Sequence, residues 1–564
     1  MNRNNEQHFA LTPTAEIGRS KFERPHSLHT SFSEGDIVPI FCEQYVPGDT
    51  IKMRMSSIVR MMTPLVPVMG DAVLDVYFFN VPWRLVWEHT KQFVGENDTS
   101  PWVNPVEYEI PQIEAPATTG WDPKSLAVYL GEPAGVPELT TNALKFRAYA
   151  CIYNNWFRSE AVQTPVYMHT DDTTQTGVNY AAATYDPVTD TELGAKMLKA
   201  CKTFDYFTGC LPSAQAGPPV ALPIAAENVP VKYGIVAEQS LQNNNPIEST
   251  LDNKPVLVRQ YNWNDQSGTQ RSMQSLDYLT SFVTNANNSG HYYSFYADLT
   301  GNTGATVTAL RQAFAVQKFY ERAGMVGMRF GEVIKGHFGV TNPDYRNMIP
   351  EYLGGYRSAV SINQVVQTSA TDAVSPQGNT AGYSVTVDRK DDLFTKSFTE
   401  WGIIMGLAVV RVKNHVYQQG QNREWAKKKR FDFYWPEFAN LSNMAVLNKE
   451  IYAQGPATLD ADGNIVDDKA FGYQEAWAEM RYSPDRVSGE LRSDYAQSLD
   501  IWGYFDKYNT LPTLSDGWIK ESEDPIGHTL AVQNHDQFFG NFYFGSVWTR
   551  PMPVYSIPGL IDHH

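Results

Sequence analysis

The chain has 564 residues and a mass of 63.5 kDa, which leaves room for up to about four domains of ordinary size. Hydrophobic residues make up 42% and charged residues 19%, a balance that excludes collagen-like sequence and wholesale disorder. The 62 Asp and Glu outnumber the 45 Lys and Arg, so the net charge of -17 repels nucleic acid overall. Any DNA contact therefore has to be local or supplied by a separate basic partner.

The longest apolar run, residues 401–410, is half the ~20 residues that a membrane-spanning helix needs. The start of the chain contains no apolar core of signal-peptide length. We therefore expect the protein to stay in the cytosol where it is made. Its four cysteines form no C-x-x-C pair, and a reducing compartment favours free thiols. A disulfide between Cys201 and Cys210 is sterically possible and stays an alternative.

Residues 1–35 are polar and follow neither a helical nor a strand period, which indicates an extended arm. Such an arm needs a partner surface to be ordered. We therefore expect it to dock on a neighbouring chain. The candidates for that contact are cationic, aromatic and imidazole side chains, namely Arg19, Phe22, Arg24, His26 and His29.

Strand patterns occur at both ends of the chain. Apolar Ile51, Met53 and Met55 alternate with polar side chains, which predicts a strand with one buried face. Further segments bounded by Gly, Asn or Pro are also expected to be strands, namely residues 73–79, 383–387, 403–412 and 542–549. Because hundreds of residues separate these strands, long excursions must connect them.

Two stretches have helical spacing instead. From Thr140 onward, apolar residues recur every three or four positions through Trp156, and Thr140 or Thr141 is expected to cap this helix. Residues 306–324 repeat the pattern, with basic residues on the opposite side and Gly324 at the expected C-terminal cap. Both helices are expected to lie in the long connections between strands.

Residues 222–297 are rich in Asn, Gln and Ser and cannot build a large core. A structureless loop of this length is uncommon inside a compact domain, so we expect a small subdomain or a projecting insertion. Some strand of its own is expected around Val256, Val258, Tyr261 and Trp263. No repeat of fixed period is present, which disfavours propellers and solenoids.

Sequence motifs for enzymatic chemistry are absent. The chain has no P-loop, G-x-G-x-x-G, H-E-x-x-H, EF-hand loop or G-x-S-x-G, and its histidines lack ligand spacing, so no metal site and no cofactor are expected. A carbohydrate-active β-sandwich enzyme, whose two acids meet only in space, stays open as an alternative. Adjacent acids occur at Asp391 and Asp392 and at Asp467 and Asp468. Another alternative is a receptor-binding, spike-like module whose insertion alone carries the function.

The densest basic cluster runs directly into aromatic residues. It consists of Lys427, Lys428, Lys429 and Arg430, followed by Phe431, Phe433, Tyr434 and Trp435. Single-stranded nucleic acid binds cations through its phosphates and aromatic faces through its bases, so the four basic residues are candidate DNA contacts. The alternatives are a solvated edge followed by a core strand, and a basic run that meets an acidic patch on another chain.

Several ordered segments carry a resemblance that spans nearly the whole chain. They are RSKFERPHSLHTSF followed by GDIVP, YFFNVPWRLVW, FRAYACIYNNWFR, DYFTGCLP, LRQAFAVQKFYERAG with HFGVTNPDYRNMIPEYLGG, and FGYQEAWAEMRYSPDRVSGELR. Together they resemble the major capsid protein of the gokushoviruses, small tailless single-stranded DNA phages of the microvirus family.

The resemblance implies a mainly β fold, an eight-stranded antiparallel jelly roll with long inserted loops that contain helices. Residues 36–564 would form this capsid domain from discontinuous strands, residues 1–35 would be an arm between subunits, and residues 222–297 would form a surface protrusion used in host attachment. The implied function is a T=1 icosahedral shell around a circular single-stranded DNA genome, with no enzymatic activity. Because the four basic residues form the densest basic cluster of an acidic chain and adjoin aromatic residues, we expect them to line the interior of that shell.

The resemblance also implies partners and a location. The chain would assemble with copies of itself in the host cytoplasm and reside in the virion. Its other partners would be a small basic DNA-binding protein, an internal scaffolding protein, a minor DNA-delivery protein, the single-stranded DNA genome and a host cell-surface receptor.

Overall fold

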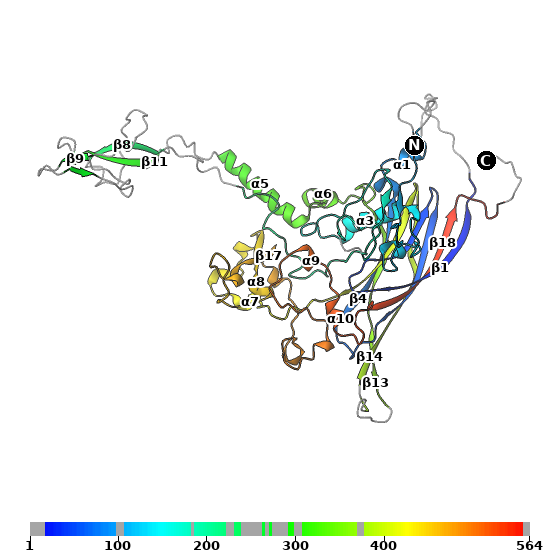
Figure 1. The fold of residues 1–564 in the computed structure, drawn as a ribbon. Coiled ribbons are helices and arrows are strands. Elements are labelled where there is room, and N and C mark those ends of the chain that lie inside the picture. The colour runs from blue at the N-terminus through cyan, green and yellow to red at the C-terminus, as the bar shows by residue number, and fades with distance from the viewer. Residues whose placement is uncertain are drawn as a thin grey trace. The chain divides into compact units, whose positions relative to one another are not determined.

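The computed structural model describes residues 17–96, 106–181, 185–220, 231–237, 262–264, 270–272, 291–297, 307–368, 377–378 and 380–556. The chain divides into two compact units, one formed by Met1–Ala216 with Glu321–His564 and the other by Gly217–Tyr320. The first unit contains two large antiparallel β-sheets (Figure 1). The fold is therefore mainly β, with helices in the connections.

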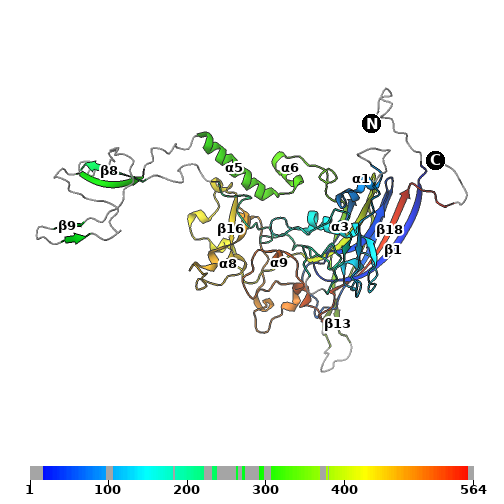
Figure 2. The ribbon, with the colours of Figure 1, turned by 45° about the horizontal axis from the view of Figure 1, so that its top comes forward.

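The larger sheet has five strands and joins the two ends of the chain. In sheet order they are β1 (Ser20–Phe32), β18 (Phe538–Arg550), β3 (Thr50–Met61), β14 (Thr380–Ser397) and β13 (Ile362–Val366). The first and last strands lie side by side, blue next to red, in Figures 1 and 2, and they pair in register from Ser20 opposite Arg550 to Phe32 opposite Phe538. The predicted strands at residues 51–55, 383–387 and 542–549 are confirmed.

The second sheet has four strands. They are β12 (Glu351–Ala359), β4 (Ala72–Pro82), β15 (Gly402–Val412) and β2 (Val38–Tyr45), in that order, and every pairing between them is antiparallel. The strands predicted at residues 73–79 and 403–412 are β4 and β15.

One hydrophobic core lies between the two sheets. Met53 on β3 and Phe544 on β18 meet Phe78 on β4 and Ile404 on β15 in this cluster. Burial alternates along β3, with outward residues such as Lys52, Arg54 and Arg60 exposed, because only one face of the five-stranded sheet is covered. The pattern read from the sequence thus identifies which face is buried.

A second core covers the other face of the four-stranded sheet. Met405 and Leu407 of β15 and Phe79 of β4 pack there in the same cluster as residues of α3 (Leu144–Ile152). Because both faces of this sheet are covered, β15 reads as a continuous apolar run instead of an alternating one.

Short elements fill the connections of the first unit. The strands among them are β5 (Gln112–Glu114), β6 (Thr140–Asn142), β7 (Gln175–Thr176), β16 (Asn443–Leu447) and β17 (Ala470–Glu475). The helices are α1 (Thr90–Phe93), α2 (Leu126–Tyr129), α6 (Phe330–Phe338), α7 (Arg423–Ala426), α8 (Asn448–Ile451), α9 (Asp516–Ile519) and α10 (Asp524–Gly527). Among the described residues, no helix has both the length and the apolar character needed to cross a membrane.

The second unit contains two antiparallel strand pairs. β8 (Val231–Ala237) pairs with β11 (His291–Ala297), and β9 (Asn262–Asn264) pairs with β10 (Gln270–Ser272). The predicted strand position Trp263 lies in β9, whereas Val256, Val258 and Tyr261 lie outside the described residues.

Two helix predictions need correction at their ends. Helix α3 begins at Leu144, because Thr140 and Thr141 belong to β6 and the side chain of Asn142 accepts a hydrogen bond from the Leu144 amide at 2.8 Å. Helix α5 (Val307–Val326) runs past Gly324. It ends before Gly327, whose φ of +102° suits a glycine that stops a helix.

The segment predicted as a patternless arm contains a strand of the chain's own sheet. Residues 20–32 are extended, as expected, but they pair with β18 along their whole length. The sequence pattern is unclear because polar residues of β1 lie against aromatic rings. The guanidinium of Arg24 lies 5.0 Å from the ring of Trp548, and the His26 ring lies 5.2 Å from that of Phe544.

Candidate nucleic-acid interface

The basic cluster lies in an irregular surface segment and not before a core strand. Helix α7 is a single turn capped by Asn422, whose side chain accepts from the Glu424 amide at 2.8 Å. The chain then turns because one carboxylate oxygen of Asp432 accepts from the Lys428 amide at 2.9 Å and the Lys429 amide at 2.7 Å. The core strand considered as an alternative after the basic run is therefore not formed.

Lys427 differs from the other three basic residues because its side chain is only 9% exposed. Its ammonium lies 3.1 Å from Glu479, whose side chain is 6% exposed, and 5.8 Å from the centre of the Trp477 ring. The neighbouring Arg423 pairs with buried Glu450 at 3.2 Å. Lys427 thus has the contacts of a structural ion pair, which costs stability when one partner is removed.

Lys428, Lys429 and Arg430 are exposed, and exposed aromatic rings accompany them. The Phe431 side chain is 69% exposed, and the Arg430 guanidinium lies 4.9 Å from the centre of the Trp435 ring. Phe433 and Tyr434 are also exposed. The segment therefore presents free cations beside open ring faces, which is the chemistry that phosphates and unstacked bases bind.

Four of the five arm candidates make side-chain contacts within their own chain. Arg19 donates to Thr50 Oγ1 at 2.7 Å, and Arg24 pairs with Glu43 at 2.6 Å. Phe22 packs against the core between the sheets, and His26 packs against aromatic rings. His29 is exposed on β1. Contact of these residues with another subunit stays a prediction.

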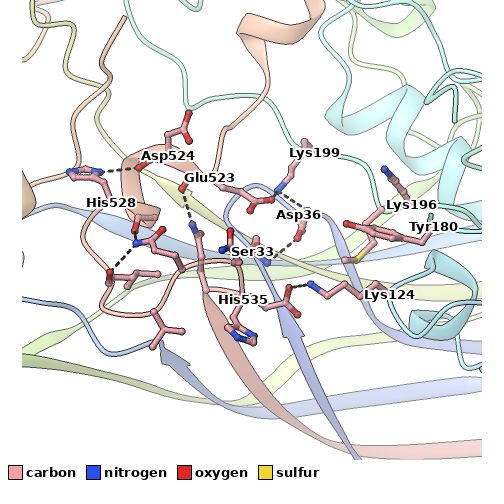
Figure 3. Close-up of a pocket in the computed structure, with 18 of the residues that line it drawn as sticks. Ser33, Asp36, Lys124, Tyr180, Lys196, Lys199, Glu523, Asp524, His528 and His535 are labelled. Atoms are coloured by element: carbon pink, nitrogen blue, oxygen red, sulfur yellow. Dashed lines mark hydrogen bonds and ion pairs between the residues drawn. The ribbon is translucent and has the colours of Figure 1, made fainter. Parts of the chain in front are cut away.

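A cavity of about 710 Å³ lies beside the connection between β1 and β2 (Figure 3). The ammonium of Lys199 pairs with Asp36 at 2.9 Å and with Glu523 at 2.7 Å, and Lys124 pairs with Asp536 at 2.7 Å. Three of the four acids that line the cavity are thus neutralised by lysine. This arrangement joins distant segments of the chain and differs from the two free acids of a glycosidase.

The adjacent acids noted in the sequence also have separate partners. Asp391 pairs with Arg389 at 2.9 Å, and Asp467 accepts from the Gln454 amide at 2.9 Å. Asp392 and Asp468 face Lys52 and Lys449. Among the described residues, no group of three or more His, Cys, Asp or Glu side chains is arranged to hold a metal ion.

Sequence reasoning missed a buried charge network around His415. The imidazole Nδ1 lies 2.8 Å from Asp506 and Nε2 lies 3.4 Å from Glu521, while Lys202 lies 3.2 Å from Asp506. Burial alone would lower the pKa of His415, but the two carboxylates raise it to about 10. Burial would raise the pKa of Asp506, but His415 and Lys202 lower it to about 2. Burial, followed by the charge of Glu521, raises the pKa of Glu34.

No sequence signal reveals this network, because its members come from separate segments, with His415 lying 91 residues and Lys202 lying 304 residues from Asp506, and none lies in a motif. The four cysteines are unpaired thiols, and burial raises the pKa of Cys42 to about 11 and that of Cys151 to about 12. Neither set of residues has the exposure that a ligand-binding site needs.

Comparison with known proteins gives one consistent match over the whole chain. The family described as "Capsid protein (F protein)" matches residues 10–560. The chain is 36% identical to "Capsid protein VP1" of Chlamydia phage 1 and 36% identical to that of Spiroplasma virus 4, each over 98% of this chain and 97% of the relative. It is also 36% identical to "Capsid protein VP1" of Bdellovibrio phage phiMH2K, over 99% of this chain and 98% of the relative. The chain therefore belongs to the F-type capsid proteins of the gokushoviruses, within the microvirus family, and is a coat protein of the virion.

Proposed function

We propose that the two large sheets form one eight-stranded jelly roll and that copies of it build a T=1 shell around a circular single-stranded DNA genome. The strand order supports the fold assignment. With β1, β2, β3, β4, β12, β14, β15 and β18 taken as strands one to eight, first pairs with eighth, second with seventh, third with sixth and fourth with fifth. A long antiparallel ribbon rolled on itself has this pairing.

The shell assignment depends chiefly on the match to capsid proteins over nearly the full length of both chains. Electron microscopy of the expressed full-length chain tests it. Monodisperse particles of megadalton mass are expected, whereas a chain that stays monomeric under all assembly conditions would contradict the proposal.

Packaged DNA is contacted by Lys428, Lys429 and Arg430, with Lys427 holding the segment in place. The support is the exposure of these three cations beside exposed rings, together with the ion pair that occupies Lys427. Changing all three to Gln should leave shells intact and reduce the DNA retained per particle. The matched control changes Lys91, Lys413 and Lys507, which are exposed lysines elsewhere, to Gln. Equal DNA retention in both variants would refute the contact, and failed assembly of the first alone would identify a protein interface.

The insertion at residues 222–297 takes part in attachment to a host cell-surface receptor. Its polar composition supports this role, because loops on a rigid scaffold commonly carry recognition. Replacing it with a short Gly/Ser linker should preserve particles and abolish adsorption to host cells. Unchanged adsorption would contradict the proposal.

The start of the chain contacts a neighbouring subunit in the shell. β1 supports this because it is an edge strand of its sheet, and among the described strands none pairs with its outer side. Deleting residues 1–19 keeps β1 and should leave a folded subunit that fails to assemble. Normal shells from this variant would rule out a contact that depends on residues 1–19.

The chain works with a small basic DNA-binding protein, an internal scaffolding protein and a minor DNA-delivery protein. The net charge of -17 supports the first of these, because a coat this acidic gains from a separate polycation when it encloses DNA. Particles assembled with and without a basic protein in the expression host should differ in the amount of DNA they retain. Equal amounts of retained DNA in the two preparations would contradict the proposal that a basic DNA-binding protein assists packaging.

A further inference from the structure

The uncovered face of the five-stranded sheet has a side-chain pattern that the coat function does not explain. Outward positions on β3 and β18 lie opposite one another, with Arg60 opposite Phe539, Ser56 opposite Tyr543 and Lys52 opposite Val547. On the other side of β18, the outward residues of β1 continue these rows with Ser31, Ser27 and Glu23. Three strands thus form one open surface, because the core lies on their opposite face.

The cations of this surface are concentrated on β3. Lys52, Arg54 and Arg60 are all outward and exposed. Among the described residues, neither Arg54 nor Arg60 pairs with a carboxylate, and Lys52 has only a distant contact of 3.9 Å with exposed Asp392. Outward neighbours on a strand are about 6.8 Å apart, so these charges extend over roughly 27 Å. In a chain of net charge -17, such a line of cations, of which Arg54 and Arg60 are unpaired, suits an anionic ligand.

One exposed aromatic ring, Phe539, lies in the same row as the cation Arg60, and a second, Tyr543, lies opposite Ser56 in the row between those of Lys52 and Arg60. The side chain of Phe539 is 44% exposed and that of Tyr543 is 43% exposed, although each is a large hydrophobic group on an otherwise solvated face. Gly545 follows on the same face of β18, and a Cβ there would lie 2.5 Å from Nε of Arg54. The absence of a side chain at this position therefore lets the Arg54 side chain lie flat across the strand beside the rings.

The combination of cations and aromatic rings on one open sheet face favours some classes of ligand over others. An acidic protein segment would use the cations and would not need the rings, whereas duplex DNA keeps its bases stacked and offers the rings nothing. Single-stranded nucleic acid uses both, because its phosphates bind the cations and its unstacked bases lie on the rings. The only acid of these three rows is Glu23, at the outer edge on β1.

We propose that the uncovered face of the β1, β18 and β3 strands binds single-stranded DNA, with phosphates at Lys52, Arg54 and Arg60 and bases stacked on Phe539 and Tyr543. This inference rests on the proposed function in one respect, that the enclosed genome is single-stranded DNA. This face is then the one turned toward the interior of the shell. It lies apart from the α7 segment that carries Lys428, Lys429 and Arg430, as Figure 1 shows for α7, β1 and β18, so the two DNA surfaces can be tested separately.

The test measures binding of a fluorescent 30-nucleotide oligo(dT) to the unassembled full-length chain between 50 and 200 mM salt. One variant carries Lys52→Gln, Arg54→Gln and Arg60→Gln. The slope of the logarithm of the binding constant against the logarithm of the salt concentration should become shallower by about 2, because each phosphate contact on a single strand contributes about 0.7. A second carries Phe539→Thr and Tyr543→Thr, which keep β propensity, and should weaken binding about 5- to 150-fold per stacked base with an unchanged slope. Inorganic polyphosphate, which has charge and no bases, should bind the second variant as well as the unchanged chain.

The controls separate this proposal from the earlier one. The Lys91, Lys413 and Lys507 variant should bind oligo(dT) normally, and thermal unfolding of every variant shows whether it is folded. If both sheet variants are folded and bind oligo(dT) like the unchanged chain, the proposal is overturned, whatever the Lys428, Lys429 and Arg430 variant does. If the sheet variants keep DNA binding and lose only assembly, the face is a protein interface, which also overturns it. Loss of binding only in the sheet variants would support this surface and refute the α7 segment as a DNA contact.

Discussion

Replacing His415 by Gln should remove most of the dependence of stability on pH between pH 7 and pH 8.5. His415 is buried between Asp506 and Glu521, with Lys202 and Glu34 beside the same carboxylates. Its pKa of about 10 in the folded chain compares with about 6.5 in the unfolded chain. The folded state therefore holds one more proton than the unfolded state across this interval, and stability falls as pH rises.

The size of the effect follows from the two pKa values. A difference of about 3.5 in pKa, at 1.36 kcal/mol each, gives about 5 kcal/mol that is fully present below pH ~6.5 and lost by pH ~10. Between pH 7 and pH 8.5 the expected loss is about 2 kcal/mol. Asp506 behaves in the opposite direction, because its lowered pKa adds stability above pH ~4 that is lost as pH falls through about 2. The two shifts share the His415–Asp506 interaction, so their contributions are not added.

Urea unfolding of the unassembled chain, followed by tryptophan fluorescence, measures this loss. Trp518 is a suitable local probe, because the ammonium of Lys202 lies 5.0 Å from its ring. The single variant leaves buried Glu521 without the His415 cation and buried Asp506 with Lys202 alone, and should lose about 3 to 5 kcal/mol. The double variant His415→Gln with Glu521→Gln removes one of them and keeps the test open if the single variant fails to fold.

A histidine in a different environment provides the control. The ring nitrogens Nδ1 and Nε2 of His528 lie 2.9 and 3.1 Å from the backbone carbonyl oxygens of Asp524 and Asp500, which can only accept, and the ring faces no carboxylate in those contacts. His528→Gln should therefore keep the full pH slope of the unchanged chain. If the His415 variants keep that slope too, the buried imidazolium is not its source and the reasoning is wrong.

Three further outcomes are expected. Lys427→Gln should lower the free energy of unfolding by about 3 kcal/mol because it leaves buried Glu479 with only the longer 3.9 Å ion pair to Arg423, whereas Lys429→Gln at an exposed position should change it by less than about 0.5 kcal/mol, both measured by urea unfolding. Trp548→Ala should cost about 3 to 5 kcal/mol in the same assay, because this fully buried ring fills the core between the sheets. Cys151, whose buried thiol has a pKa of about 12, should react with a thiol-specific colour reagent at pH 8 only after denaturant is added.

Strands whose pattern is set by local burial could be predicted from the sequence. β3 alternates because only one of its faces is covered, and β15 is continuously apolar because both are. β1 could not be recognised in this way, because Arg24 and His26 occupy positions against Trp548 and Phe544, which lie more than 500 residues away. The hydrophobic periodicity of a segment cannot predict contacts between its cations and aromatic rings in distant segments.

The sequence predicted which residues form the basic cluster at 427–430, but not how those residues are arranged in space. The run of basic residues is visible in the sequence, but the burial of Lys427 depends on Glu479, about fifty residues later. The outward cations of β3 were equally visible as the polar half of an alternating strand. Only the pairing of β3 with β18 brings them beside Tyr543 and Phe539, so no linear motif could show that surface.

The place of β18 between β1 and β3 fixes when the sheet can form during synthesis. β3 ends at Met61 and β18 begins at Phe538, so at 5 to 20 residues per second the ribosome needs about 25 to 100 s to deliver the missing strand. Until then β1 and β3 lack their shared neighbour, and the rows of cations and rings do not exist. A nascent coat chain therefore cannot present this face to DNA, and a chain that ends early never completes the sheet. The topology thereby restricts this face to finished subunits.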